Sequence, residues 1–409
     1  MADLAILERG DVLIDQDAIV AVGQRLSIPP RVRMIEADGR VLMPAFVDCH
    51  THACWAGDRL DEWAQQLAGA TYLEILRAGG GIMSTVRAVR ACTEEGLIAG
   101  LRHRLQAMLN LGSTTVEVKS GYGLGTEGEI RMLRAIERAH APSSFPLRHK
   151  PMRQIDEPIP LPSVVATALL GHAIDPEVEN FVERTIRETL PAVHRQFPDI
   201  PVDAYCETAA WSVADTVRLL ADAKRLGHPI RVHADQFHDL GMAPQAVRLG
   251  ARSVDHLEAS SRATLDALAA SDTFGVILPC CGLHAGASEG RFASMRRFVS
   301  AGGLLALATN FNPGSAPCPS MPLAIALAVR NCGITPAEAI IAATVNPATL
   351  LGLSDRGTIA PGQRADLILL RHTDERKLAY EFGDDPVDQV ILAGRVVKGP
   401  APEGLPGAP

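Results

Sequence analysis

The chain has 409 residues, of which 47% are hydrophobic and 21% charged, ordinary values for a globular protein but too long for one small core. A net charge of −8 without long Lys/Arg runs argues against nucleic acid as a partner, whereas an anionic small molecule fits because one placed arginine can hold a carboxylate. The N-terminus carries acidic residues early, and no stretch approaches about 18 consecutive apolar residues, so neither a secretory signal nor a membrane span is expected. Eight scattered cysteines favour a cytoplasmic location over a disulfide framework.

Both ends of the chain contain short β-rich segments separated by turns. The first set covers residues 4–10, 11–14, 18–23 and 32–43, and the second covers residues 357–370 and 387–397. The middle of the chain has a different character. We therefore predict that residues 1–43 and 356–409 combine into one small β-sandwich domain, and that residues 44–355 form a second domain.

The middle of the chain alternates apolar, β-branched runs with segments of helical periodicity such as residues 213–227. The eight runs are residues 45–50, 113–120, 164–172, 202–207, 229–235, 251–257, 273–279 and 304–310. Near-continuous apolar strands alternating with helices indicate a buried parallel sheet. Eight such units predict an α/β fold with a closed (β/α)8 TIM barrel. The Pro-rich stretch 143–162 breaks the rhythm and is expected to be a long loop near the barrel mouth.

Polar side chains capable of chemistry stand at or near the ends of most of these strands. They are His50, Lys119, His172, Glu207, His233, His256 and Asn310. The C-terminal ends of all strands in such a barrel open onto one face, where the active site lies. We therefore expect these side chains to share one site.

The His50-Thr51-His52 triplet closes the first strand, and His233 closes the fifth. Side-chain alternation in a strand puts residues two apart on the same side, so both imidazoles of the triplet can face one metal ion. Three neutral imidazoles suit Zn²⁺ or Fe²⁺. The alternative is that these histidines are polar residues of the rim or core.

Several longer motifs are more specific than the histidine triplet. They are MPAFVDCHTHACWAGDR, GGGIMSTVRAVR, TTVEVKSGYGL, YCE, VHADQF, SVDHLE and LATNFNPGS. Together they resemble the imidazolonepropionase family of the amidohydrolase superfamily over almost the whole chain. The resemblance implies a cytoplasmic, metal-dependent hydrolase of histidine degradation. Such an enzyme opens the cyclic amide of 4-imidazolone-5-propanoate and yields N-formimino-L-glutamate.

The resemblance also implies roles for individual residues. One divalent ion, zinc or iron, would be held by His50, His52, His233 and Asn310, where the family has Asp at the last position. Arg59 and the loop containing Asn312, Gly314 and Ser315 would hold the propionate, and Tyr72 and an exposed Tyr122 would line the ring pocket. His172 and His256 would bind the ring and stabilise developing charge, and Gln236 would stand where family members have Glu or Gln.

Some of these residues have simpler alternatives. Tyr72 could pack on a helix face, and Arg59 could pair only with the nearby acids Asp58, Asp61 or Glu62. Lys119 could be a carboxylated bridge between two metals, although a structural role fits the family pattern better. Glu117 and Glu207 are expected to brace the site through hydrogen bonds. Related barrels are often homodimers, which leaves a homodimer open by analogy alone.

Asn310 challenges the implied mechanism because an amide takes no proton at neutral pH. Three explanations are open: an inactivating replacement of a natural Asp, another base such as His256 or Glu207, or a diverged substrate. Cys280, Cys281 and His284 near the mouth would suit a hydantoin- or thiohydantoin-propionate ring, the latter with release of sulfide. A catalytically inactive binding protein is a further alternative, but the intact histidines argue against it.

Overall fold

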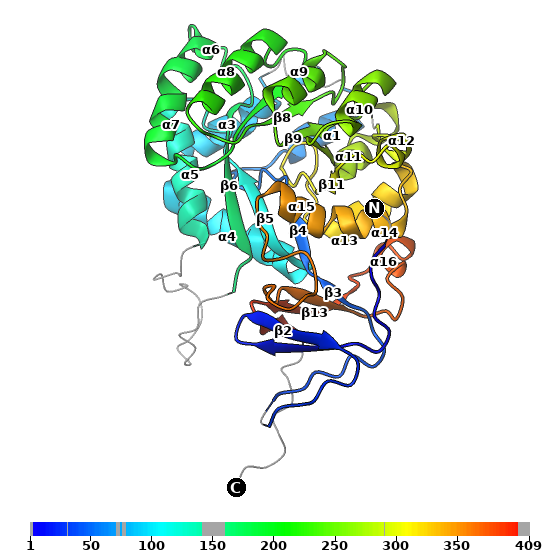
Figure 1. The fold of residues 1–409 in the computed structure, drawn as a ribbon. Coiled ribbons are helices and arrows are strands. Elements are labelled where there is room, and N and C mark those ends of the chain that lie inside the picture. The colour runs from blue at the N-terminus through cyan, green and yellow to red at the C-terminus, as the bar shows by residue number, and fades with distance from the viewer. Residues whose placement is uncertain are drawn as a thin grey trace.

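The structure is a computed structural model that describes residues 3–30, 32–70, 74–75, 79–140, 160–289 and 291–399. Its centre is a sheet of eight parallel strands whose spatial order follows their order in the chain (Figure 1). The strands are β4 (Phe46–Asp48), β5 (Ser113–Lys119), β6 (Ser163–Gly171), β7 (Val202–Cys206), β8 (Arg231–Ala234), β9 (Ser253–His256), β10 (Phe274–Ile277) and β11 (Leu305–Leu307). Each coincides with one of the eight predicted runs, so the predicted (β/α)8 barrel is confirmed.

The barrel closes where the segment after β11 meets the segment after β4. The backbone N–H of Asn310 donates to the carbonyl of His50 at 3.0 Å, and that of His52 donates to the carbonyl of Phe311 at 3.0 Å. The hydroxyl of Thr309 also donates to Asp48 at 2.5 Å. These contacts fix the histidine triplet against the end of the eighth strand.

Helices surround the strands in Figure 1 and bury them on the outside. They are α1 (Leu60–Leu67), α3 (Ile82–Ala91), α4 (Glu94–Asn110), α5 (Thr126–His140), α6 (Phe181–Arg184), η1 (Thr185–Thr189), α7 (Leu190–Gln196), α8 (Val213–Arg225), α9 (Met242–Leu249), α10 (Arg262–Ala269), α11 (Pro279–Glu289), α12 (Arg296–Ser300), α13 (Met321–Asn331), α14 (Pro336–Ala342), α15 (Val345–Leu350) and α16 (Lys377–Tyr380). Local sequence sets several starts. Ser212 caps α8 by accepting from the N–H of Asp215, and Thr335 with Glu338 forms a capping box on α14.

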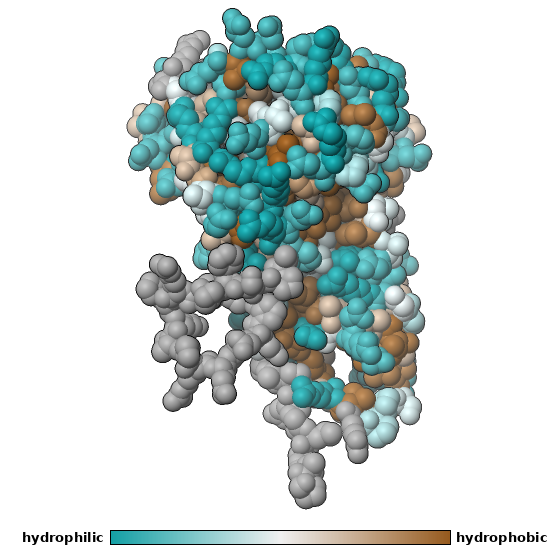
Figure 2. All heavy atoms as spheres, turned by 90° about the vertical axis from the view of Figure 1, so that its left-hand side faces the viewer, coloured by the Kyte–Doolittle hydropathy of each residue, from teal (hydrophilic) through white to brown (hydrophobic). Residues whose placement is uncertain are grey.

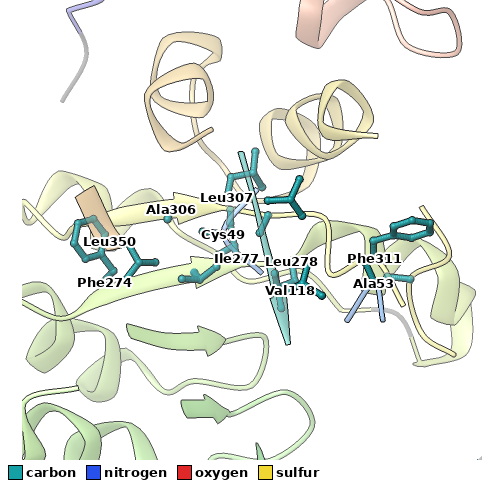
Figure 3. Packing of buried hydrophobic residues seen from close by; sticks show 14 of the residues in the cluster. Cys49, Ala53, Val118, Phe274, Ile277, Leu278, Ala306, Leu307, Phe311 and Leu350 are labelled. Atoms are coloured by element: carbon teal, nitrogen blue, oxygen red, sulfur yellow. The ribbon is translucent and has the colours of Figure 1, made fainter. Parts of the chain in front are cut away.

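One apolar cluster joins the strands to the helices. Figure 3 shows it running from Phe274 and Leu350 at one end to Phe311 at the other, with Ile277 and Leu307 between them. Full burial of side chains of this size stabilises a fold by roughly 1.5–3 kcal/mol each. The core therefore holds the strand ends, and the polar side chains on them, in fixed positions.

The two chain ends form a separate β unit below the barrel in Figure 1. Strands β1 (Asp11–Asp15) and β2 (Ala18–Gly23) pair with each other, and a second sheet has the order β14 (Arg395–Lys398), β13 (Val387–Leu392), β12 (Leu367–Leu370), β3 (Leu42–Pro44). A small cluster joins the two sheets through Ile19, Ala365, Leu367 and Ile391. The predicted β unit from both ends is confirmed, while its exact boundaries at residues 43 and 356 stay a prediction.

Two predicted strands of this unit are wrong. Residues 4–10 form no strand, and only the end of 32–43 does, as β3. Ala5 and Arg9 have φ angles of 49° and 53°, and Asp38 has a φ of 52° before a left-handed Gly39. Left-handed residues interrupt an extended backbone, so apolar content alone overestimated these strands.

Tyr72 and most of the predicted loop 143–162 lie outside the described residues. Over the described part, no helix has both the length and the apolar character that crossing a membrane requires. Figure 2 shows mostly hydrophilic residues over the barrel half of the visible face and larger apolar areas toward the β unit.

Candidate active site and metal centre

The candidate site lies at the C-terminal ends of the barrel strands, where several residues have unusual backbone conformations. Asp235 follows β8 with a φ of 59°, His256 ends β9 with a φ of 94°, and Asn310 follows β11 with a φ of 56°. Residues other than glycine rarely adopt positive φ, and such strain clusters at functional sites. The strand ends predicted from sequence are therefore also the strained ends.

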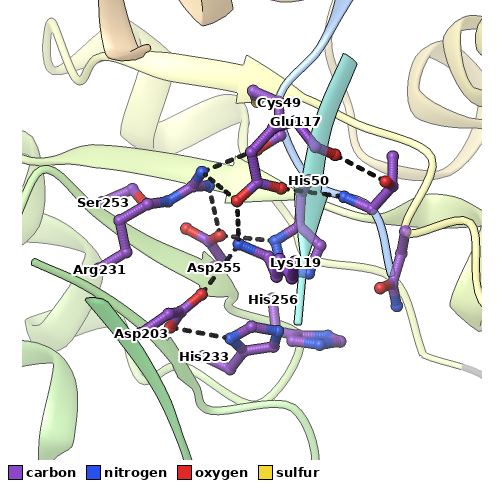
Figure 4. Close-up of polar contacts among 12 residues, drawn as sticks. Cys49, His50, Glu117, Lys119, Asp203, Arg231, His233, Ser253, Asp255 and His256 are labelled. Carbon is purple, nitrogen blue, oxygen red and sulfur yellow. Dashed lines mark hydrogen bonds and ion pairs between the residues drawn. The ribbon is translucent and has the colours of Figure 1, made fainter. Parts of the chain in front are cut away.

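A cluster of buried imidazoles occupies this face (Figure 4). Ring nitrogens of His50, His233 and His256 lie within 4.8 Å of one another, which makes these three a group able to hold a metal ion. The Nε2 atom of His52 lies 3.4 Å from that of His233, although His52 is not a member of the group of three. The structure thus brings all four histidines together and places His256 beside the three predicted histidine ligands.

His50, His52 and His233 are held as neutral imidazoles, which is the form that binds metals. Burial lowers the pKa of His50 and His52 well below the usual value, and it also lowers the pKa of His233. Asp255 accepts a hydrogen bond from Nδ1 of His50 at 2.6 Å, and Asp203 accepts one from Nδ1 of His233 at 3.1 Å. A carboxylate that accepts the Nδ1 proton leaves the lone pair of Nε2 available to bind a metal ion.

Several buried atoms of this site have no hydrogen-bond partner among the described residues, and they include Nε2 of His50, Nδ1 of His52 and Oδ1 of Asn310. Buried polar atoms are normally satisfied, so unpaired ones at the same strand ends indicate a place where a ligand binds. A nitrogen and an oxygen donor beside neutral imidazoles fit a divalent ion such as Zn²⁺. The site could therefore hold a divalent metal ion.

A buried ion network supports the histidines from below, and sequence reasoning missed most of it. Lys119 donates to Glu117 at 2.7 Å and to Asp203 at 2.9 Å. Arg231 donates to Asp255 at 2.6 Å and to Glu117 at 3.2 Å. Figure 4 shows these charges joined into one connected network, to which His233 is attached through Asp203. Charged residues inside apolar strand runs were the signal, because buried charges must be paired.

The network also bears on Lys119, for which two roles were considered. Burial lowers its pKa, but Asp203 and Glu117 outweigh that effect and hold the pKa above its usual value. An ammonium held by two carboxylates has no free amine to carry a carboxyl group. The geometry thus favours the structural role of Lys119 over the carboxylated bridge. Glu117 also accepts from the N–H of Thr51 at 3.2 Å and so braces the histidine triplet, as predicted.

Arg59 lies against the loop that contains Gly314, and its binding of a carboxylate stays a prediction. An added methyl group on Gly314 would lie 2.8 Å from Nη1 of Arg59, so the guanidinium lies against this loop. Arg59 also pairs with Glu62 at 2.5 Å, so the alternative pairing occurs as well. The side chain of Asn312 shapes the loop by accepting from the N–H groups of Gly314 and Ser315 at 2.8 and 2.7 Å.

The aromatic wall predicted from Tyr122 differs from expectation in one respect. Tyr122 is 4% exposed rather than open at the mouth, because its ring packs 5.1 Å from His172 and 6.1 Å from His52. Burial raises its pKa, so the phenol stays protonated. His172 stacks on His52 at 5.0 Å and shares its Nδ1 proton with the carbonyl of Gly121 at 2.9 Å.

Gln236 and Glu207 lie at the ends of neighbouring strands but have different hydrogen-bond partners. The amide oxygen of Gln236 accepts from the hydroxyl of Tyr205 at 2.8 Å, and the Tyr205 ring lies 5.9 Å from His233. Glu207 accepts from the backbone N–H groups of Thr208 and Phe237. It also accepts from the backbone N–H and from the ring Nδ1 of His238. With both oxygens occupied, Glu207 braces the loop after β8 and is poorly placed as a base.

A parallel barrel with a buried histidine cluster at its C-terminal face defines a hydrolase of the amidohydrolase type. Residues 41–397 match the model of the amidohydrolase family, and the chain belongs to that family. Within it, the chain is a member of the imidazolonepropionases. The imidazolonepropionase of Deinococcus radiodurans is 44% identical over 96% of this chain and 93% of its own length. That of Herpetosiphon aurantiacus is 43% identical over 97% of this chain and 92% of its own length.

Solved structures agree on the fold. The 5-methylcytosine deaminase from Klebsiella pneumoniae, liganded with phosphonocytosine, superposes with a TM-score of 0.71 at 17% identity and covers 97% of this chain and 96% of its own. Identity this low shows the fold alone. The sequence relatives support a hydrolase of carbon–nitrogen bonds acting on a small molecule, and they favour the imidazolone over the hydantoin or thiohydantoin hypothesis.

Proposed function

We propose that the chain hydrolyses the cyclic amide bond of 4-imidazolone-5-propanoate and yields N-formimino-L-glutamate. The observation that carries this proposal is the pairing of a buried histidine cluster with an arginine-lined corner at the same barrel face. The histidine cluster suits a metal that activates water and a ring carbonyl. The arginine-lined corner suits the propionate arm. The eight cysteines are all free, which supports a reducing cytoplasmic location.

The ligands of a zinc or iron ion would be His50, His52 and His233, with Asn310 at the end of the eighth strand, while His256 of the same cluster would stay unligated for proton transfer. When bound, such an ion supplies Lewis-acid polarisation and a nucleophile at neutral pH by lowering the pKa of water. Asp255 and Asp203 hold the two imidazoles in the required tautomer. The apolar core around the site excludes bulk water and strengthens these interactions.

The chain's own residues orient the substrate. Arg59 presents a planar fork to the propionate beside Gly314, and Tyr122 with His172 forms one wall of the ring pocket. A carbonyl can only accept, so Nδ1 of His172 carries the proton that it shares with Gly121. Neutral His172 thus presents its Nε2 lone pair, which suits a ring N–H rather than an oxyanion. This refines the predicted role of His172.

Proton transfer must avoid Asn310, whose amide takes no proton. Both carboxylate oxygens of Glu258 lie 3.3 Å from Nδ1 of His256, and the side chain of Glu258 is buried beside the histidine cluster. We assign the proton that leaves the attacking water and reaches the ring nitrogen to the pair of His256 and Glu258. Glu207 neither takes the proton from water nor delivers it to the ring nitrogen, because its oxygens already accept hydrogen bonds.

Replacing Glu258 by glutamine is expected to lower kcat for imidazolone propionate by about 10²–10⁴-fold, the usual contribution of a positioned acid or base. Loss of the ring chromophore and mass spectrometry of the product measure the rate. Metal content should stay near that of the wild type, since the histidines are unchanged. The comparison variant is Asn310→Asp. A gain of about 10²-fold or more in Asn310→Asp would show that the chain lacks a working base and would contradict the assignment.

Replacing Arg59 by alanine is expected to raise KM about 10–100-fold, because a hydrogen bond to a charged group contributes about 1.5–3 kcal/mol. The control is an imidazolone whose propionate is converted to the amide. Wild type and variant should turn over this analogue equally well. An unchanged KM for the propionate would show that Arg59 serves only its ion pair with Glu62.

Hydantoin propionate and its 2-thioxo analogue belong in the same assay. Turnover of the imidazolone alone supports the proposal. Release of sulfide from the thioxo ring, without turnover of the imidazolone, would overturn it in favour of the diverged substrate. Binding of the imidazolone without turnover of any ring would identify an inactive binding protein.

A further inference from the structure

Cys281 on α11 makes two contacts that the proposed chemistry does not use. The side-chain N–H of Asn310 donates to its sulfur at 2.7 Å, and the thiol points toward the hydroxyl of Ser315 at 4.0 Å. All these groups are buried or partly buried, and Cys281 is 5% exposed. A thiol can accept one hydrogen bond and donate another. Here the sulfur accepts from Asn310 and the S–H is directed at Ser315.

The contact with Cys281 decides which way the amide of Asn310 faces. The amide is planar, so fixing Nδ2 on the sulfur turns Oδ1 to the opposite side. Oδ1 is fully buried and accepts no hydrogen bond from any residue that the structure describes. The backbone N–H of Asn310 donates to the carbonyl of His50 at 3.0 Å, so the backbone at position 310 adjoins that of the first histidine of the cluster.

The second contact leads to the other half of the site. The hydroxyl of Ser315 accepts from Nδ2 of Asn312 at 3.0 Å, and the same Nδ2 donates to the backbone carbonyl of Asn310 at 2.6 Å. Asn312 in turn shapes the backbone at Gly314, against which Arg59 lies. One buried thiol therefore touches both the strand end at the metal centre and the loop that faces the propionate.

We propose that Cys281 is a positioning residue that holds Asn310 with its Oδ1 directed at the metal centre as a neutral oxygen ligand. This inference rests on the proposed metal site and deepens it. Asn310 and Cys281 act as a matched pair, because only the amide can both donate to sulfur and offer an oxygen. A carboxylate at position 310 would have no proton to donate, and the thiol would have to turn from Ser315 to satisfy it.

The test measures metal affinity of the full chain, free of substrate, by competition with a chromogenic chelator for Zn²⁺. Cys281→Ala is expected to raise the dissociation constant about 10–100-fold, the usual effect of removing a group that orients a ligand. Cys281→Ser, which keeps a donor and an acceptor, should recover most of the affinity. The visible spectrum of the Co²⁺-loaded protein should change in Cys281→Ala, because a ligand oxygen is lost or displaced.

The matched control is Cys280→Ala, which removes a buried thiol from the adjacent position on the same helix. It should leave the Zn²⁺ dissociation constant and the Co²⁺ spectrum unchanged. A double variant shows whether Cys281 acts through Asn310, since Cys281→Ala should have no further effect on affinity in an Asn310→Ala background. Circular dichroism checks that each variant folds, and Cys281→Val replaces Cys281→Ala if the latter does not.

The outcomes separate this inference from the proposed function. Wild-type protein that binds neither Zn²⁺ nor Co²⁺ overturns both. Wild-type protein that binds metal, with an unchanged affinity and spectrum in Cys281→Ala, overturns the role of Cys281 alone. An equal loss of affinity in Cys280→Ala, or an undiminished effect in the Asn310→Ala background, would show a general packing effect and would also overturn it.

Discussion

His233→Ala is expected to be purified without a stoichiometric metal ion and to turn over imidazolone propionate at least about 10³-fold more slowly, because metal catalysis supplies several kcal/mol of transition-state stabilisation. His233 is central to the cluster. Its Nε2 lies 3.4 Å from that of His52, and its ring nitrogens belong to the group formed with His50 and His256. Removing its imidazole therefore takes away a nitrogen that lies close to the other candidate ligands.

Elemental analysis of the purified protein gives the metal content, and the ring chromophore gives the rate. Asp203→Asn is the graded comparison, since it keeps the ligand but weakens its orientation. A loss of about 10–100-fold in metal affinity is expected there. His194→Ala is the control for loss of a histidine, because His194 pairs with His228 away from the cluster. Full metal content in His233→Ala would refute the assigned centre.

The barrel and its active face followed from the sequence because a buried parallel strand leaves a clear trace. Each strand is a short apolar run, and the residue that ends it faces the site whatever its neighbours are. The His50-Thr51-His52 triplet and His233 could be placed together on that basis alone. The predicted strand at residues 4–10 and most of the one at residues 32–43 failed for the converse reason. In an exposed segment, a few left-handed residues decide the path, and apolar content does not reveal them.

Two features of the site could not be predicted from the sequence. Sequence spacing says nothing about which strand residues face one another across a barrel, so the contacts from Lys119 and Arg231 to their carboxylates could not be assigned. The second feature is the hydrogen bond between Asn310 and Cys281, which joins segments 29 residues apart. Asn310 looked like a defect in sequence. In the structure it is part of a specific polar arrangement, which favours a working site over a degraded one.

Breaking the ion network beneath the site from one side is expected to destabilise the barrel, and Arg231→Met tests this. Arg231 donates to Ser253, to the carbonyl of Cys49, to Glu117 and to Asp255. Methionine fills similar space but leaves two buried carboxylates with less compensation. Breaking a buried ion pair from one side typically costs about 3–5 kcal/mol, so the free energy of unfolding should fall by that amount.

Urea unfolding followed by circular dichroism, with recovery on refolding verified, measures the change in the free energy of unfolding. Arg231→Lys should lose less, because it keeps the charge but not the planar fork that reaches four partners. Arg297→Met is the matched control, since Arg297 pairs with Asp266 on the surface and such pairs contribute at most about 1 kcal/mol. If Arg231→Met were as stable as Arg297→Met, the network would position the histidines without stabilising the fold. His50 should then lose orientation as Asp255 moves, and metal affinity would fall while the unfolding curve stayed in place.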